Sequence, residues 1–175
     1  MENVPESGRS RVYRRIVDQL TTDPVLRGIV GEWICWDGVK RDAAKLAAQK
    51  PLIELYPTLG PVGFRGPEAL VGDLEITIEM LVPKSFNACD CMDLWTAVEN
   101  ALYPVNDREK VLAFQAQLRG CDGSHGCDKP CDAETGEILI SRPATIQQAP
   151  DGNGGFAHYV CTGSIAIRIL RTINP

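Results

Sequence analysis

The clearest strand pattern in the chain runs from position 74 to position 82. Five apolar residues fall on one side of an alternating pattern: Leu74, Ile76, Ile78, Met80 and Val82. Glu75, Thr77, Glu79 and Leu81 fall on the other side. Because successive side chains of a strand point to opposite faces, this pattern predicts a strand with one buried and one solvent-facing side, which ends at Pro83.

A second strand pattern fills the C-terminal part of the chain and predicts a long hairpin. Residues 137–149 read as an extended segment in which Pro143 requires an edge position or a bulge. The sequence Asp-Gly-Asn-Gly-Gly at 151–155 is a strong turn signal. The returning strand has one mainly apolar face: Tyr159, Cys161, Ile165, Ile167 and Ile169. His158, Thr162, Ser164 and Arg168 lie mostly on the other face, and we expect His158 to be a structural or surface residue.

Helical spacing dominates the N-terminal part. Apolar residues recur on one stripe of residues 11–20, which predicts an amphipathic helix. Asp23 and Pro24 end that helix and begin a second, short one, since Asp caps helices and Pro is tolerated at the first helical position. The second helix continues at helical spacing through Val25, Leu26, Ile29, Val30 and Trp33.

Two further helices are predicted after Pro83. Leu94, Trp95, Val98 and Leu102 form one side of the first, which Tyr103-Pro104 terminates. Asn106 and Glu109 form a capping pair for the second, and Gly120 is a natural end for it. The apolar side of this last helix is Val111, Phe114 and Leu118.

The segments between these elements carry weaker patterns. Residues 52–56 predict a short strand. Residues 58–72 hold four glycines and two prolines, which predicts a long loop and a candidate interaction element. Residues 37–51 favour either a loop or a frayed helix.

This order of elements favours an α+β fold. We expect a mostly antiparallel β-sheet of about four strands, with helices packed on one face and a long C-terminal β-hairpin. Residues 1–10 are expected to be a flexible N-terminus and residues 11–175 a single domain, which includes a cysteine-rich loop at 121–136. A length of 175 residues suits one domain.

Charge changes the list of expected partners. The chain has 18 Lys and Arg residues against 23 Asp and Glu residues, a formal net charge of -5. Tight binding to nucleic acid normally needs a basic face. The basic cluster is Arg9, Arg11, Arg14 and Arg15, which we interpret as a solvated helix face, with contact to an acidic partner as the alternative. No apolar run reaches the length of a membrane helix, and we expect no secretory signal and no membrane association.

Cysteine is unusually frequent. The seven residues, all candidates for disulfide bonds, are Cys35, Cys89, Cys91, Cys121, Cys127, Cys131 and Cys161. An odd number leaves a free thiol or a bond to another chain. Spacing does not determine the pairing: Cys131 suits either Cys121 or Cys127, and Cys89 and Cys91 would reach different partners if extended.

A metal-binding module is an alternative use of these thiols. Cys121, His125, Cys127 and Cys131 offer four ligands suited to zinc, although they lack Cys-x2-Cys spacing. The string Cys-Asp-Gly-Ser-His at 121–125 resembles the end of the signature of CDGSH iron–sulfur proteins. That family places a Cys-x-Cys pair close before the string, whereas 29 residues separate Cys91 from Cys121 here. Arg119 also stands where the family has proline.

Catalytic motifs are scarce in the sequence. There are two histidines, no P-loop, no His-Glu-x-x-His pair and no Gly-x-Ser-x-Gly elbow. We therefore expect a protein that is not an enzyme and that uses no cofactor. An enzyme of an unrecognised family is the remaining alternative.

The element order as a whole resembles the tail terminator and tail-completion (neck) proteins of tailed bacteriophages. The segments that carry this resemblance are 11–24, 52–56, 74–82, 97–104, 138–146 and 163–169. The cysteine-rich loop is not a usual feature of that family, and it suggests a virion reinforced by disulfides.

The resemblance implies a structural virion protein assembled in the host cytoplasm. Six copies would form a homohexameric ring that caps the tail tube, contacts tube and sheath proteins and joins them to the head-tail connector. DNA would pass through the lumen without sequence-specific binding, and the loop predicted at 58–72 would contact the tube or the sheath. A head-closure or other neck adaptor protein is the alternative role within the same architecture.

Overall fold

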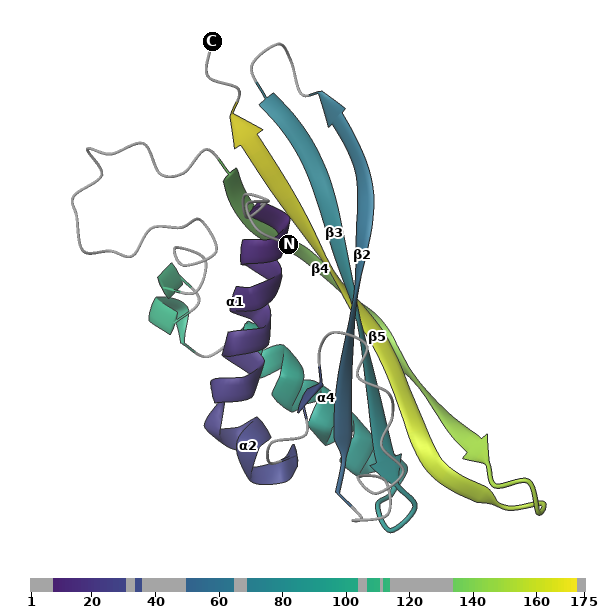
Figure 1. Cartoon of the computed structure of the whole chain (residues 1–175). Coiled ribbons are helices and arrows are strands. Elements are labelled where there is room, and N and C mark those ends of the chain that lie inside the picture. The colour runs from purple at the N-terminus through teal and green to yellow at the C-terminus, as the bar shows by residue number, and fades with distance from the viewer. Residues whose placement is uncertain are drawn as a thin grey trace, which may run out of the picture.

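The computed structural model is a twisted sheet with helices on one face (Figure 1). It describes residues 8–30, 34–35, 50–64, 69–103, 107–110, 112–113 and 134–172. The helices are α1 (Gly8–Thr22), α2 (Pro24–Val30) and α4 (Ala88–Leu102). Residues 108–110 and 112–113 are also helical. Each of the helices predicted before residue 104 is thus present, and α1 begins at Gly8 rather than at residue 11.

Within the described residues the sheet has five strands in the order β1-β2-β3-β5-β4. Their bounds are β1 (Ile34–Cys35), β2 (Leu52–Phe64), β3 (Ala69–Pro83), β4 (Glu134–Pro150) and β5 (Phe156–Thr172). The two-residue β1 pairs parallel to β2, and all other neighbours are antiparallel. The predicted α+β class, the helix-covered face and the long C-terminal hairpin are confirmed, and β1 adds a short strand beyond the four expected.

The loop predicted at residues 58–72 is wrong. In the structure β2 continues to Phe64 and β3 begins at Ala69, so most of this stretch is paired strand. The register shifts between Leu59 and Val62, which accommodates Gly60 and Pro61 in an irregular position. Beyond the two-residue contact with β1, no described strand covers the outer edge of β2, and prolines are tolerated at such an edge.

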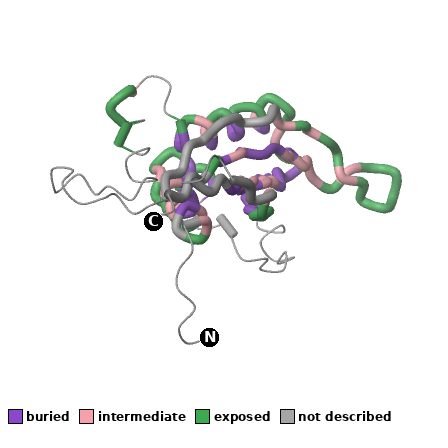
Figure 2. Tube along the Cα trace, turned by 90° about the horizontal axis from the view of Figure 1, so that it is seen from above, coloured by how far each residue is buried: buried purple, intermediate pink, exposed green. Residues whose placement is uncertain are grey.

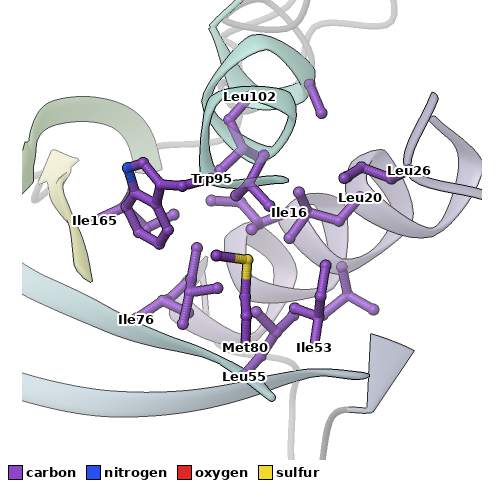
Figure 3. Close-up of a cluster of buried hydrophobic side chains, with 14 of the residues drawn as sticks. Ile16, Leu20, Leu26, Ile53, Leu55, Ile76, Met80, Trp95, Leu102 and Ile165 are labelled. Carbon is purple, nitrogen blue, oxygen red and sulfur yellow. The ribbon is translucent and has the colours of Figure 1, made fainter. Parts of the chain in front are cut away.

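The core lies between the helices and the apolar face of the sheet (Figure 3). The five residues of the predicted apolar face of β3 are at most 1% exposed, which confirms that pattern. The helices contribute Ile16, Leu20, Leu26, Trp95 and Leu102, and the strands contribute Ile53, Leu55, Ile76, Met80 and Ile165. The apolar stripes of α1 and α4 therefore face the same side of the sheet, as burial of both elements requires.

Side-chain caps fix where the helices begin. The Asp23 carboxylate accepts from the backbone N–H groups of Val25 and Leu26, both at 2.9 Å, so its predicted capping role is confirmed. Asn87 and Asp90 form a reciprocal capping box at the start of α4, which satisfies N–H groups that have no partner within the helix.

The start of the helical turn after α4 differs from the sequence prediction. The backbone N–H of Lys110 donates to Asp107 Oδ1 at 3.1 Å, so the capping carboxylate is that of Asp107. Asn106, which was predicted to cap this helix, lies outside the described residues, as do Phe114, Leu118 and Gly120. Asp107 fits the position because its short carboxylate reaches the N–H three residues on.

A close approach joins α4 to β5. A side chain at Gly163 would place its Cβ 2.6 Å from Trp95 Cζ2 and in contact with the ring's Cη2 atom. The Trp95 indole N–H donates to Glu99 Oε1 at 2.9 Å, so the ring is held by a polar contact at one end and by the sheet at the other. Glycine at 163 is what allows the helix and the strand to approach this closely.

The C-terminal hairpin follows the sequence prediction closely. Pro143 lies within a register shift between Arg142 and Thr145, on the edge strand β4, which confirms the expected bulge. β4 begins at Glu134, so the last three residues of the predicted loop at 121–136 belong to the strand. The rest of that loop and most of residues 37–51 lie outside the described residues. None of the described helices is long and apolar enough to cross a membrane.

Candidate assembly surface

The C-terminal hairpin extends beyond the two-layer body. None of the residues from 144 to 160 is buried, whereas β5 becomes buried at Cys161. Figure 2 shows the turn of this hairpin as an exposed loop that projects away from the remaining strands. We refer to residues 144–160 as the hairpin arm and to residues 151–155 as the arm tip. Ala144, Ile146 and Tyr159 pack against the core and attach the base of the arm to the body.

Hydrogen bonds within the chain give the arm tip a defined shape. Asp151 Oδ1 accepts from the backbone N–H groups of Asn153 at 2.8 Å and Gly155 at 3.0 Å. The Asp151 N–H donates to the Gly155 carbonyl at 3.1 Å. Gly152 and Gly154 adopt φ angles of 82° and 87°, which side chains disfavour. The bonds from Asn153 and then Gly155 lower the pKa of Asp151, so the carboxylate is charged at neutral pH.

An aromatic pair links the tip to the base of the arm. The ring centroids of Phe156 and Tyr159 are 5.0 Å apart and the rings are tilted by 56°, within the range of favourable aromatic contacts. Because Tyr159 also packs against the core, this pair restrains the arm relative to the body. The arm is therefore an ordered projection with an exposed polar tip.

The face of the sheet opposite the helices is acidic in its middle part and apolar at one end. Asp73, Glu75 and Glu79 of β3 share this face with Glu54 of β2, which is only 3% exposed and is the cross-strand partner of Glu79. Next to them the paired Leu52 and Leu81, on the same face, are at most 1% exposed. Two hydroxyl donors support these carboxylates: Ser164 Oγ donates to Glu75 at 2.8 Å, and the Tyr56 hydroxyl donates to Glu54 at 2.7 Å.

An ion pair on this face joins β5 to β3. Arg168 Nε lies 3.6 Å from Asp73 Oδ1, and both side chains are nearly half exposed. An exposed pair of this kind contributes little to stability. The described part of the face therefore lacks the array of cations that would hold a nucleic acid backbone.

The N-terminal arginines divide between the body and the surface. Arg9 Nη2 donates to the Gly60 carbonyl at 3.2 Å, and its guanidinium lies against Gly72, so Arg9 attaches α1 to the sheet. Arg14 is exposed and Arg15 is half-buried, while the side chain of Arg11 lies outside the described residues. The expectation of a solvated helix face therefore fails at Arg9, because its long side chain reaches back to β2 and β3.

The predicted pattern of α2 splits between core and surface. Leu26 and Val30 are fully buried, whereas Val25 and Ile29 are 58% and 38% exposed. Trp33 lies outside the described residues. The helix therefore presents a small apolar pair to solvent in addition to its buried side.

Three of the disulfide candidates have described side chains, and all three are free thiols. Cys89 is exposed, whereas Cys91 and Cys161 are buried. Burial, followed by the negative charge of Asp90, raises the pKa of Cys91. A thiol with no exposed surface cannot reach a neighbouring subunit, so only Cys89 of these three is placed for a bond between chains. The side chains of Cys35, Cys121, Cys127 and Cys131 lie outside the described residues.

Alkaline pH is expected to destabilise the protein through Cys161. Burial, and then the charge of Cys91, raises the pKa of Cys161 from 9.0 to about 11. The folded state therefore binds the proton more tightly than the unfolded state, so the stabilisation is complete below pH 9 and is lost as the pH rises through 11. The loss is of the order of 2 kcal/mol.

Chemical denaturation between pH 8 and pH 11.5 checks this expectation. The difference in unfolding free energy between the wild type and Cys161→Ala removes the titrations that both proteins share. Parallel pH curves for the two proteins would contradict the assigned origin of the pH dependence.

The structure does not test the predicted metal ligands. Cys121, His125, Cys127 and Cys131 lie outside the described residues. Among the side chains that are described, no three His, Cys, Asp or Glu residues come together as a metal site. His158 is half-buried on β5, within the hairpin arm, in agreement with a structural or surface role.

Comparison with known proteins finds little sequence similarity. No known protein family and no curated protein matches the chain. A chain in a solved structure titled "Virion of native gene transfer agent (GTA) particle" is 16% identical, with a TM-score of 0.46. The alignment covers 94% of this chain and 93% of that chain. A similarity at this level of identity and TM-score does not assign a function.

Proposed function

We propose that the chain is a structural protein of a tailed phage-like virion, and specifically the ring-forming tail terminator that caps the tail tube. The hairpin arm carries this proposal. The body of the chain buries a core of its own, whereas none of the 17 residues from 144 to 160 is buried. The tip in the middle of this segment is held in shape by hydrogen bonds within it. An ordered projection of this kind is suited to contact a neighbouring copy.

The symmetry of such a contact favours a ring. The arm lies at one end of the sheet and the helices cover one face, so an arm that contacts the body of the next copy makes a head-to-tail interface. Interfaces of that type close into rings when the rotation between copies allows it. The sequence resemblance to tail terminators implies six copies.

The charge of the sheet supports a role in which DNA passes without being held. Asp73, Glu75 and Glu79 lie on the helix-free face, and the chain carries a net charge of -5. Carboxylates repel the phosphate backbone, whereas lysines and arginines would hold it through counterion release. A structural rather than an enzymatic role, without a cofactor, forms part of the same proposal.

Mass photometry and electron microscopy of the purified full chain test the proposal. We expect particles of about six times 19.1 kDa that appear as rings with a central opening, either alone or after addition of purified tail tubes. A monomer under both conditions, at every concentration, would contradict it. Labelled protein should decorate one end of a tail tube, whereas a head-closure or other neck adaptor protein would bind the connector and leave bare tube ends unlabelled.

A further inference from the structure

Two buried thiols lie on facing elements of the core. Cys91 belongs to α4 and Cys161 to β5, and both are free and 0% exposed. Both belong to the same cluster of buried side chains. Neither is needed to hold the arm, and neither can reach a second copy, so the proposed function leaves their chemistry unexplained.

The Trp95–Gly163 contact fixes the alignment of the two elements. Cys91 lies four residues before Trp95, about 6 Å back along the same side of the helix. Cys161 lies two residues before Gly163, about 7 Å back along the same face of the strand. α4 and β5 both run from the arm end of the sheet toward its other end (Figure 1), so the two steps have the same general direction. Cys91 is thereby placed over Cys161.

Two further observations agree with this placement. Some Cα atoms of α4 lie within 8 Å of Cα atoms of β5, so the two elements pack against each other, and a small further approach brings a pair within the roughly 7 Å that a disulfide spans. The charge of Cys91 also contributes to the raised pKa of Cys161, which requires the two sulfur atoms to lie within electrostatic reach. The geometry and the electrostatic interaction therefore pair the same two residues.

We propose that Cys91 and Cys161 form an internal disulfide when local opening of the core lets a low-molecular-weight disulfide such as oxidised glutathione reach one of the two buried thiols. One protein thiolate attacks the oxidant, forming a mixed disulfide and releasing one glutathione thiolate. The second protein thiolate then attacks the protein sulfur of that mixed disulfide and releases the second glutathione. Two protein thiols are oxidised, and one oxidised glutathione is reduced to two thiols. The product fastens α4 to β5 within one chain.

Peptide mapping of the oxidised protein tests the proposal. The native full chain is incubated with oxidised glutathione, denatured in the presence of N-ethylmaleimide, and digested with trypsin and Glu-C without reduction. Trypsin alone leaves Cys161 on one peptide with Cys121, Cys127 and Cys131, because Lys129 and Arg142 both precede proline, and Glu-C separates Cys161 from these three by cutting after Glu134 and Glu137. Cys89 and Cys91 stay on one peptide, so the Cys89→Ser variant assigns that side of the bond. We expect a linked peptide pair that joins Cys91 to Cys161 and separates on reduction, together with a higher melting temperature of the oxidised protein.

Cys91→Ser and Cys161→Ser are the matched controls. Each is expected to lose the linked pair and to leave the other cysteine as an alkylated thiol, while Cys89→Ser retains the pair. The proposal fails if Cys91 and Cys161 are both recovered as alkylated thiols from oxidised protein in which Cys89 carries glutathione, or if either is linked to a different cysteine. Mapping of the wild type and Cys89→Ser decides the outcome even where the controls fail to fold. The result is independent of ring formation, because the bond lies within one chain.

Discussion

Gly163→Ala is expected to destabilise the fold by about 3 kcal/mol, at the upper end of the usual cost of overpacking a core. The added methyl group would meet Trp95 at two ring atoms, Cη2 and Cζ2, the latter at 2.6 Å. Trp95 is only 7% exposed and its indole N–H is bonded to Glu99, so the ring cannot swing aside without loss of packing and of that bond. Urea denaturation of the wild type and the variant measures the effect.

Two further variants make this experiment specific. Gly28→Ala is the matched control, because a Cβ at Gly28 meets nothing within 4 Å and alanine is the better helix former. It should be neutral or stabilising by up to about 1 kcal/mol. Combining Gly163→Ala with Trp95→Leu should cost less than the sum of the single changes, because the smaller side chain relieves the clash. A Gly163→Ala protein as stable as the wild type would show that α4 does not approach β5 as closely as described.

Removal of the arm tip together with its neighbours Pro150, Phe156 and Ala157 is expected to weaken assembly strongly while leaving the folded monomer intact. The variant replaces residues 150–157 with Asn-Gly, which closes the hairpin directly between the paired residues Ala149 and His158. None of the replaced residues is buried, so the melting temperature should fall only by the small contribution of the Phe156–Tyr159 ring contact. If the tip contacts a neighbouring copy, its loss should weaken association at least about tenfold, which corresponds to about 1.4 kcal/mol.

Sedimentation velocity over a range of concentrations measures this effect. A length-preserving change in the tip, Asn153→Ser, keeps the backbone donor that bonds to Asp151 and serves as the control for the shape of the turn. Assembly of the shortened variant at wild-type concentrations, with rings of normal appearance, would place the contact between copies elsewhere on the surface.

Sequence patterns correctly predict the elements whose conformation is set by residues close together in the chain. The alternation from Leu74 to Val82, the Asp23 cap and the glycine-rich turn at 151–155 act through neighbouring residues, and each is found as expected. The sequence wrongly predicts a loop at residues 58–72, because the glycines and prolines of this stretch are typical of loops. Its strand conformation is imposed by pairing with distant residues of β3 and by the edge position of β2, neither of which is visible in the sequence.

The sequence predicts part of the candidate assembly surface, but not the contacts between residues far apart in the chain. The arm followed from the turn signal and the two flanking strand patterns, and its projection beyond the core became evident only from the burial of the neighbouring residues. The contact of Arg9 with Gly60 joins residues 51 positions apart, so a basic cluster in the sequence gave no sign of it. The alignment of Cys91 with Cys161 likewise depends on how a helix packs on a strand, which spacing along the chain does not encode.

The irregular outer strands of the sheet have a consequence for how copies of the chain meet in solution. β4 has three register shifts and contains Pro143, and β2 contains Pro57 and Pro61, which have no backbone N–H to donate. Straight, uninterrupted outer strands are templates for uncontrolled aggregation, and kinks and prolines suppress that process. Folded copies of the chain are thus expected to resist aggregation through backbone pairing at these outer strands.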